Sequence, residues 1–290
     1  MCVLDDVLTR AEQEQRWRDQ RSSFVPPSEL FDPSRYGAEP IDSDNVARAF
    51  VQQHHYSGSY PAARCRVGLY HKPAFQAPVL VGVAVFSVPA QQAVIPKWTG
   101  QEPSRGVELG RFVLLDDVRF NGETWFLARA FELLRQQIPA VRAVVSYSDP
   151  VRRRTSEGEI VLPGHVGRIY QAHNGVYMGR SKRRTLILAP DGRVVSPRAV
   201  SKLRNGERGQ DYAERQIVGM GAPTRRRHES RRAWVNRVLA DPSLFRKFRH
   251  PGNHCYTWGL CRSARRRLPE PQVDTGYPRS IDAVRVTAAA

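Results

Sequence analysis

Residues 108–147 run from an apolar strand pattern, through an amphipathic helical pattern, into a second apolar strand pattern. The first segment, 108–115, is rich in leucine, valine and phenylalanine, and residues 123–137 repeat apolar side chains at helical spacing. Residues 141–147 then form a short run dominated by valine and alanine. Two strands separated by one long helix in this way are typical of α/β domains.

Segments on either side extend this pattern. Residues 45–51 have helical spacing, and residues 64–70 and 78–86 are rich in β-branched residues, with a turn between them that favours an antiparallel hairpin. A helix over 164–173 and a strand over 184–188 close the series. We therefore predict an α/β fold in which a mixed central sheet is flanked by helices.

The rest of the chain differs in composition. Residues 1–40 combine a charged helical pattern over 3–20 with a stretch rich in Ser, Pro and Asp, and predict an arm or linker. Residues 41–190 form the predicted α/β domain, 191–270 a basic extension, and 271–290 a disordered tail.

The charge balance is strongly positive. The chain carries 45 Lys and Arg against 28 Asp and Glu, a formal net charge of +17, which predicts a polyanionic partner such as nucleic acid. No apolar run approaches the about 18 residues of a membrane span, and the acidic N-terminus lacks the apolar core of a secretory signal. Four scattered cysteines do not form a disulfide framework. These features predict a soluble, cytoplasmic protein.

Much of the excess charge lies in residues 221–270, where 13 Lys and Arg face three acidic residues. Cations release counterions from phosphates, so this region predicts contact with DNA. Trp234, Tyr256 and Trp258 are candidates to wedge into the duplex or stack on a base, with burial in the core as the alternative. The candidate DNA-binding residues are Arg152, Arg153, Arg154, Lys182, Arg183, Arg184, Arg225, Arg226 and Arg227.

A short loop joins the strand at 108–115 to the helix at 123–137. Gly122 lets the backbone approach a ligand, and the unpaired amides at the start of a helix bind anions. An ordinary helix start capped by Asn121 or Thr124 is the alternative. The candidate residues for binding a phosphate-containing cofactor are Arg111, Arg119, Asn121, Gly122, Glu123 and Thr124.

The order of helix, hairpin strands, strand–loop–helix and splayed strand resembles the GNAT superfamily of acyl-CoA-dependent N-acyltransferases. The phosphate loop of that superfamily follows the pattern Arg/Gln-x-x-Gly-x-Gly/Ala. Arg119 and Gly122 match two of its three positions, whereas Thr124 departs at the third and narrows the loop. The resemblance implies that the cofactor is acetyl-CoA or another acyl-CoA.

Five segments between Asp44 and Leu188 carry a more specific resemblance, namely 54–58, 108–116, 121–126, 146–150 and 164–171. In this order they resemble the Mom family of bacteriophage DNA-modification proteins. The resemblance implies a GNAT-type transferase that converts adenine N6 in double-stranded DNA to an acyl or carbamoylmethyl (acetamido) derivative and so protects phage DNA from restriction. In this interpretation residues 41–190 are the catalytic domain.

The Mom resemblance also implies a bound iron ion, Fe(2+), with ligand positions that fall on His55, Tyr56 and Asp149. Imidazole, phenolate and carboxylate form a mixed nitrogen and oxygen set that suits iron. Without the resemblance, His54 and His55 would be interpreted as a polar helix end, and Asp149 as a cap of the turn before Pro150.

The proposed chemistry is demanding because the exocyclic amine of adenine is conjugated with the ring and is a poor nucleophile. A metal acting as a Lewis acid would lower the barrier, and the base would have to flip out of the duplex to reach the site. Tyr147 and Tyr170 are candidate proton donors or acceptors, or else core residues. The candidate catalytic residues are Tyr147, Asp149, Tyr170 and Ser148, with Ser146 as a further hydrogen-bond donor.

Two other functions remain open at this level. One is a GNAT-type N-acetyltransferase acting on protein, RNA or a small amine. The other is a non-catalytic DNA-binding protein in which the basic extension binds the DNA and the acyltransferase-like domain is inactive.

Overall fold

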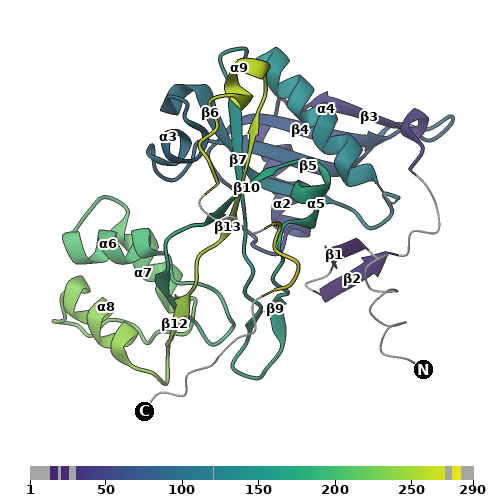
Figure 1. Ribbon diagram of the computed structural model, residues 1–290. Helices are drawn as coiled ribbons and strands as arrows, with labels where there is room; N and C mark the ends of the chain where they lie inside the picture. The colour runs from purple at the N-terminus through teal and green to yellow at the C-terminus, as the bar shows by residue number, and fades with distance from the viewer. Residues whose placement is uncertain (1–13, 19–20, 26–30, 120, 272–275, 282–290) are drawn as a thin grey trace, which may run out of the picture. The chain divides into compact units, whose positions relative to one another are not determined.

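The computed structural model describes residues 14–18, 21–25, 31–119, 121–271 and 276–281 (Figure 1). The chain divides into two compact units that alternate along the sequence. We call the first the sheet unit; it contains the described residues up to Pro150 together with 165–180 and 253–281. The second, the insertion unit, contains 151–164 and 181–252.

A seven-stranded sheet forms the centre of the sheet unit, in the order β10-β13-β7-β6-β5-β4-β3. All neighbouring strands are antiparallel except β6 and β7, which are parallel. The predicted mixed sheet is therefore confirmed. Its strands are β3 (Tyr36–Pro40), β4 (Ala63–His71), β5 (Val79–Ser87), β6 (Gly106–Leu114), β7 (Ala143–Ser148), β10 (Val176–Arg180) and β13 (His254–Gly259).

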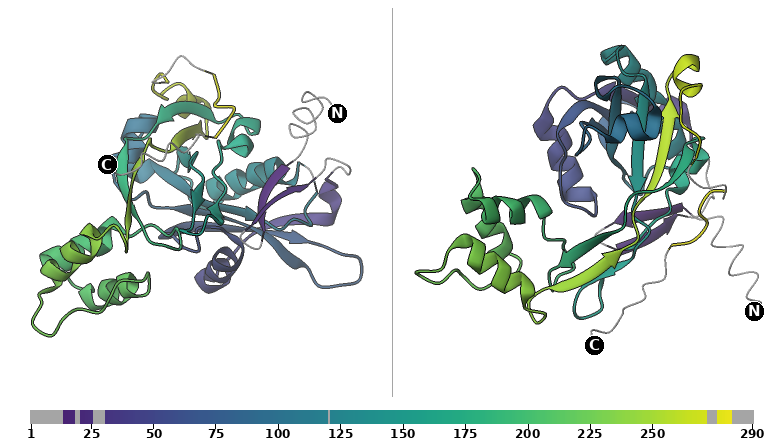
Figure 2. Two further views of the ribbon diagram at one scale, coloured as in Figure 1. Left: turned by 90° about the horizontal axis from the view of Figure 1, so that it is seen from below. Right: turned by 60° about the vertical axis from the view of Figure 1, so that its left-hand side comes forward.

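Helices cover both faces of this sheet (Figure 2). Side chains alternate along β5, so Ala84 and Phe86 pack with α4 (Gly122–Gln137), while Val83 and Val85 pack with α2 (Asp44–His54). The α/β class with flanking helices is confirmed. The shorter helices of the unit are α3 (Val94–Thr99), α5 (Arg168–Ala172) and α9 (Arg262–Arg265), with 3-10 turns at Pro33–Arg35 and Pro103–Arg105.

The far side of the sheet differs from the expectation. The strand predicted at 184–188 forms as β11 (Arg184–Leu188), but it pairs with β12 (Arg246–His250) in a separate two-stranded sheet. The central sheet is completed instead by β10 and β13. All six residues of β13 are buried, so it lacks the polar alternation that marks a strand with one solvated face.

The N-terminal region also differs from the predicted helical arm. Residues Glu14–Arg18 form β1, which pairs with β2 (Arg21–Val25), where the sequence predicted a helix over 3–20. Residues 3–13 of that predicted helix lie outside the described part of the chain. β3, which lies within the predicted linker, is a strand of the central sheet.

The insertion unit contains three helices, α6 (Pro197–Asn205), α7 (Gln210–Val218) and α8 (Arg231–Ala240), around a core that includes Trp234 and Ile217. Figure 1 shows these helices grouped together. A hairpin of β8 (Arg153–Arg154) and β9 (Ile160–Leu162) also belongs to this unit.

The boundary expected at residue 190 does not match this division. The chain leaves the sheet unit after β10 and returns to it at β13, because β13 hydrogen-bonds between β10 and β7. Residues 254–259 of the predicted extension are therefore part of the central sheet.

Part of the predicted disordered tail is ordered. The Tyr277 hydroxyl donates to the carbonyl of Gly175 at 2.9 Å, and the carbonyl of Pro278 accepts from Gln171 Nε2 at 3.0 Å. Residues 272–275 and 282–290 lie outside the described part of the chain. Among the described residues, none of the helices has the length and apolar character needed to cross a membrane.

Candidate active site

The parallel strands β6 and β7 part after three residue pairs. The paired residues are Gly106 with Ala143, Val107 with Val144, and Glu108 with Val145. Beyond Glu108 and Val145 the two strands no longer pair. β6 continues to Leu114 along β5 alone. At the point of parting, Ser146 Oγ donates to the carbonyl of Leu109 at 3.0 Å. The segments that follow both strands supply the candidate site.

The first part of the site is the segment after α2. His55 is the C-cap of that helix and has an extended backbone, which turns the chain away from the helix axis. The rings of His55 and Tyr56 lie 4.2 Å apart between centroids. His55 Nδ1 lies 2.9 Å from Ser57 Oγ and accepts from the Ser57 amide at 3.2 Å, so the imidazole is held by its own loop.

The second part of the site is the end of β7 and the residue His165. The amide of His165 donates to the carbonyl of Asp149 at 2.8 Å, so the chain returns from residues 150–164 to the point at which it left. The Tyr56 hydroxyl lies 3.3 Å from His165 Nε2. This contact joins the two parts of the site. His165 has no predicted role from the sequence, although it lies in the segment 164–171 that resembles Mom proteins.

Arg111 on β6 ties the first part of the site to the sheet. Its Nε donates to the carbonyl of Ser59 at 2.8 Å and its Nη2 to Ser59 Oγ at 2.6 Å. Its charge also acts on His55, whose pKa it lowers. Arg111 was predicted to bind the cofactor; its observed contacts fix the loop that carries His55 and Tyr56.

Both imidazoles of the site are neutral at neutral pH. Both rings keep some contact with solvent. Burial is nevertheless the largest cause that lowers the pKa of His55 well below its usual value, and Arg111 and His165 lower it further. Burial also lowers the pKa of His165, against an opposing effect of Asp149. A neutral imidazole offers a lone pair that can bind a metal or accept a proton.

The predicted catalytic residues on β7 divide between the two faces of the sheet. Burial is the largest influence on the phenol of Tyr170 and raises its pKa, while the Ser146 hydroxyl acts in the opposite direction. Tyr147, one residue on, packs instead with Trp98 and Cys255, and burial raises its pKa well above the usual value. Because successive side chains of a strand point to opposite faces, Tyr147 does not share the site with Ser146, Ser148 and Tyr170.

Ser148 is buried beside a glycine that leaves room for it. A Cβ on Gly167 would lie 3.2 Å from Ser148 Oγ and 2.8 Å from both Tyr170 and Tyr256, and Gly167 has a φ of +77°, so a larger residue is excluded there. Within the described part of the chain, Ser148 Oγ has no hydrogen-bond partner. A buried hydroxyl in this state is explained by a ligand or a water molecule.

The predicted cofactor loop forms the start of α4. A Cβ on Gly122 would lie 2.5 Å from Val118 Cγ1, so glycine is required here by packing. The Thr124 hydroxyl donates to the carbonyl of Asn121 at 3.1 Å, and Asn121 takes a left-handed backbone conformation with a φ of +71°. Glu123 is buried at the same helix end, where its carboxylate would compete with a bound anion for the helix dipole. Binding of acyl-CoA at this loop stays a prediction.

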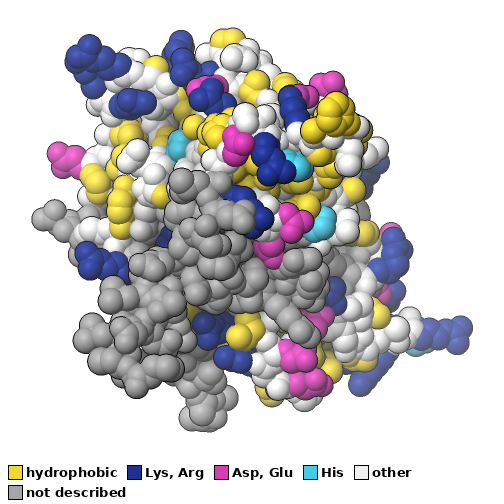
Figure 3. All heavy atoms as spheres, turned by 90° about the vertical axis from the view of Figure 1, so that its right-hand side faces the viewer, with side chains coloured by type: hydrophobic (Ala, Val, Ile, Leu, Met, Phe, Trp, Pro, Cys, Tyr) yellow, Lys and Arg dark blue, Asp and Glu magenta, His cyan; other side chains and the backbone are white. Residues whose placement is uncertain are grey.

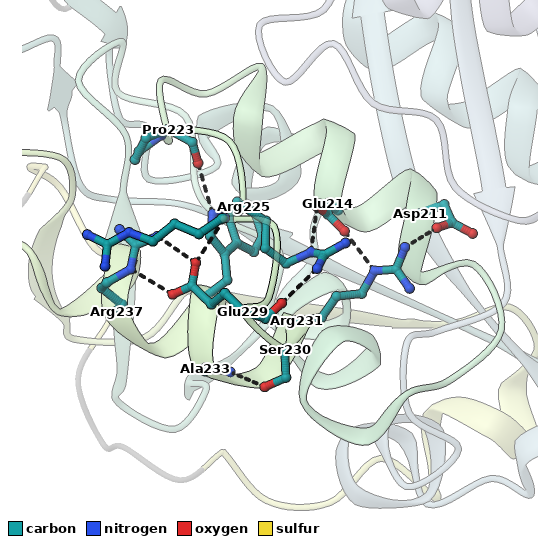
Figure 4. A network of polar contacts seen from close by, with 11 residues as sticks. Asp211, Glu214, Pro223, Arg225, Glu229, Ser230, Arg231, Ala233 and Arg237 are labelled. Atoms are coloured by element: carbon teal, nitrogen blue, oxygen red, sulfur yellow. Dashed lines mark hydrogen bonds and ion pairs between the residues drawn. The ribbon is translucent and has the colours of Figure 1, made fainter.

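The predicted DNA-binding residues differ in their contacts. Arg225 is engaged within the insertion unit, donating from Nε to Glu214 Oε1 at 3.1 Å and from Nη1 to the carbonyl of Glu229 at 2.7 Å (Figure 4). Arg152 and Arg154 donate to backbone carbonyls of their own hairpin. The exposed members of the set are Arg154, Lys182, Arg183, Arg184, Arg226 and Arg227.

The cationic residues do not spread evenly over the surface. On the face in Figure 3, Lys and Arg side chains are interspersed with acidic and apolar ones. In residues 191–250, by contrast, 15 Lys and Arg face six acidic residues. The excess positive charge is therefore a property of the insertion unit.

The aromatic residues predicted to contact DNA are part of the protein core. Trp234 is fully buried and donates from Nε1 to the carbonyl of Pro223 at 2.9 Å. Tyr256 is also fully buried, and Trp258 is 7% exposed. The alternative interpretation as core residues is confirmed, and none of the three is available to stack on a base.

The three residues that the resemblance implies as metal ligands come from the two joined parts of the site. Within the described residues, no group of three His, Cys, Asp or Glu side chains is arranged to hold a metal ion. A metal at this place would therefore need the phenol oxygen of Tyr56 beside imidazole and carboxylate groups. The donor types of His55, Tyr56 and Asp149 fit iron in chemical character.

Comparison with known proteins gives one family match. The model of the Mom protein family matches residues 38–268, which is most of the chain. A search of solved structures finds a tandem GNAT protein from the clavulanic acid biosynthesis pathway, at 11% identity and a TM-score of 0.37, covering 78% of this chain and 99% of that chain. The search of curated proteins finds no match. Since the family model spans the sheet unit and the insertion unit, the chain belongs to the Mom protein family.

Proposed function

We propose that the protein is an acyl-CoA-dependent transferase that modifies adenine N6 in double-stranded DNA. The observation that carries the proposal is the contact between Tyr56 and His165, which joins the segment after α2 to the end of β7. The residues brought together there belong to segments on which the resemblance to Mom proteins rests. The parting of β6 and β7 beside them agrees with the splayed strand expected of a GNAT-like transferase.

The proposed reaction forms a bond between adenine N6 and the thioester carbonyl carbon of the donor. The carbon–sulfur bond breaks, the CoA thiolate leaves, and the proton lost by N6 passes to a base and then to the thiolate. We assign the role of that base to His165, because burial lowers the pKa of its imidazole and so favours the neutral form, which can accept a proton. Tyr170 and Ser148 are proposed to bind and orient the substrate.

Membership of the family implies a metal, and His55, Tyr56 and Asp149 are proposed to hold it. A metal there would supply a Lewis acid beside a weakly nucleophilic amine. His55 would offer a neutral imidazole to the metal, Tyr56 a phenol oxygen and Asp149 a carboxylate. Arg111 fixes the loop that carries two of them through Ser59.

The metal proposal has a test that does not depend on activity. Purified protein is expected to contain iron by elemental analysis, and Tyr56→Phe is expected to contain much less. If both proteins contain the same amount of iron, or neither contains any, the assignment of Tyr56 as a ligand is wrong.

The partner is proposed to be double-stranded DNA, held by exposed cations of the insertion unit. The exposed residues Lys182, Arg183, Arg184, Arg226 and Arg227 are suited to phosphate contacts. We propose no such contact for Arg225, because its guanidinium is already engaged by Glu214. Acyl-CoA is proposed to bind near Arg119 and the start of α4.

The proposal is tested by digesting plasmid DNA from expressing cells into nucleosides and separating them by chromatography with mass detection. The account expects a heavier deoxyadenosine with the wild-type protein and none with Asp149→Ala. Tyr60→Phe is the matched control, because its hydroxyl donates to Asp44 on α2 and lies outside the proposed site. Loss of the product in Tyr60→Phe as well would show only that this region is sensitive to substitution.

The alternatives give different outcomes in this experiment. An N-acetyltransferase acting on protein, RNA or a small amine would leave the nucleosides unchanged and consume acetyl-CoA with another substrate. A non-catalytic DNA-binding protein would bind plasmid and leave both the nucleosides and the acetyl-CoA unchanged.

A further inference from the structure

The insertion unit contains two helices of equal length joined by a short turn. α6 and α7 each have nine residues, and the chain between them contains Gly206 and Gly209, which take φ values of +68° and +87°. Helix α8 shares a core with both, including the buried Leu203, Ile217 and Trp234. Two helices joined by a short glycine-containing turn are the pattern of a helix-turn-helix.

The outward side of α7 carries an exposed aromatic residue and an exposed cation. Ala213 and Ile217 face the core, whereas Tyr212 is 65% exposed and Arg215 is exposed. Residues three apart in a helix are neighbours on its surface, so the phenol and the guanidinium lie on the same side. Within the described part of the insertion unit, Tyr212 is the exposed large aromatic residue.

The acidic residues of α7 are neutralised within the unit. Arg231 forms ion pairs with both Asp211 and Glu214, and Arg225 pairs with Glu214 at 3.1 Å (Figure 4). These carboxylates would otherwise repel a polyanion. With these charges compensated by arginine, the exposed side chains of α7 that can donate a hydrogen bond to a phosphate are Tyr212 and Arg215.

We infer that α6 and α7 act as a helix-turn-helix that binds double-stranded DNA, with Tyr212 and Arg215 donating hydrogen bonds to phosphates. Tyrosine and arginine are common phosphate contacts, and in this motif the second helix approaches the duplex. This inference rests on the proposed function, because it assumes that DNA is the partner. It names the surface of the protein that would contact this partner. The residues of that surface lie outside the predicted DNA-binding set.

The test measures the affinity of the full-length protein for a labelled 20-base-pair duplex by fluorescence anisotropy over a series of salt concentrations. Tyr212→Ala combined with Arg215→Ala is expected to weaken binding by about tenfold or more, and to reduce the slope of log affinity against log salt by about one. Tyr212→Phe with an intact Arg215 separates the hydroxyl from the ring and is expected to weaken binding by itself.

The matched control is Arg232→Ala. Arg232 is an exposed arginine on α8, outside the two helices of the proposed motif, so this change removes the same charge from the same unit. It is expected to alter affinity by no more than about twofold, because an exposed charge that contacts no phosphate is largely screened by salt. Unfolding curves of all variants are expected to overlay that of the wild type, because each replaced side chain is exposed.

The outcomes separate the inference from the proposed function. If the wild type binds the duplex and the double variant binds as tightly as Arg232→Ala, the inference about α7 is overturned and the proposed partner stands. If the wild type binds no duplex at low salt, the proposed DNA partner itself fails. If the double variant loses affinity only for single-stranded oligonucleotides, the assignment to duplex DNA is wrong.

Discussion

Tyr56 and His165 are 109 residues apart in the sequence, yet their side chains lie 3.3 Å apart. Neither the spacing nor the residue types in the sequence indicate that pairing. The hydrogen bond from the His165 amide to the Asp149 carbonyl brings the two ends of segment 150–164 together and so places His165 beside the end of β7. The two parts of the candidate site are thus joined by a backbone contact that no local sequence motif indicates.

His165→Ala is expected to reduce DNA modification by about 100-fold or more, because general base catalysis contributes that much. The product is quantified as heavier deoxyadenosine in plasmid digests. His228→Ala, which removes an exposed histidine of the insertion unit, is the control and is expected to leave the yield unchanged. A normal yield from His165→Ala would exclude His165 as the base.

The two tyrosines first considered for catalysis are expected to behave differently. Tyr170→Phe removes a buried hydroxyl on the same side of the sheet as Ser146 and should lower the rate of modification by at least about tenfold. Tyr147→Phe removes a hydroxyl on the opposite face of the sheet, and the rate should stay within about twofold of the wild type. Initial rates measured with both variants decide the matter, and equal losses would contradict the division of β7 into two faces.

At the scale of elements, Gly122 at the start of α4 is expected to tolerate no side chain. Alanine is normally favoured over glycine in a helix, but its Cβ here would lie 2.5 Å from Val118 Cγ1. Gly122→Ala should therefore lower the free energy of unfolding by about 1–3 kcal/mol, as overpacking does. Urea unfolding measures the change, with Gly276→Ala as a control at an open position.

The elements that the sequence predicts well carry a clear pattern of residue types. The helices α2 and α4 repeat apolar side chains at helical spacing, and the strands β4, β5, β6 and β7 are rich in β-branched or other apolar residues, so each forms close to its expected position. The strands β10 and β13 are not predicted, because their short sequences mix polar, aromatic and glycine residues and show no such pattern. The predicted helix over 164–173 shortens to α5, which Gly167 precedes as N-cap.

The site could be predicted only in part for a related reason. His55, Tyr56 and Asp149 were identified through a family resemblance, and the structure brings their segments together. Trp234 and Tyr256 lie among arginines in the sequence, which leaves contact with DNA and burial in the core both open; the structure shows that they are fully buried. Composition records the charge of a region; it does not record which side chains face the core.

At the scale of the whole molecule, stability is expected to fall as the solution becomes acidic. Burial lowers the pKa of His55, His165 and His173 in the folded protein, so below the usual histidine value near 6.5 the unfolded chain binds more protons. The free energy of unfolding should therefore decrease as pH falls from about 7 to 5.5.

Melting temperatures measured across that range test the prediction. The paired acids do not produce this change, because the pKa of Glu229 is lowered to about 2 by Arg237, and its contribution is lost only at more acidic pH. A melting temperature that stays constant or rises between pH 7 and 5.5 would show that the histidines are not held neutral by burial.

The division of the chain places the proposed chemistry and the excess charge in different units. His55, Tyr56, Asp149 and His165 belong to the sheet unit, whereas the exposed cations 182–184 and 226–227 belong to the insertion unit. Substitutions in the insertion unit should therefore alter DNA affinity and its salt dependence, and those in the sheet unit should alter the rate of modification of bound DNA. Single-turnover rates with saturating protein separate the two effects.

The most direct measurement incubates the purified protein with a duplex oligonucleotide and acetyl-CoA labelled with carbon-13 in the acetyl group, and determines the mass of each nucleoside after digestion. The account predicts labelled carbon on deoxyadenosine alone with the wild-type protein, and none with Asp149→Ala. Label on another nucleoside would contradict the account, as would an unlabelled digest from a protein that binds both DNA and acetyl-CoA.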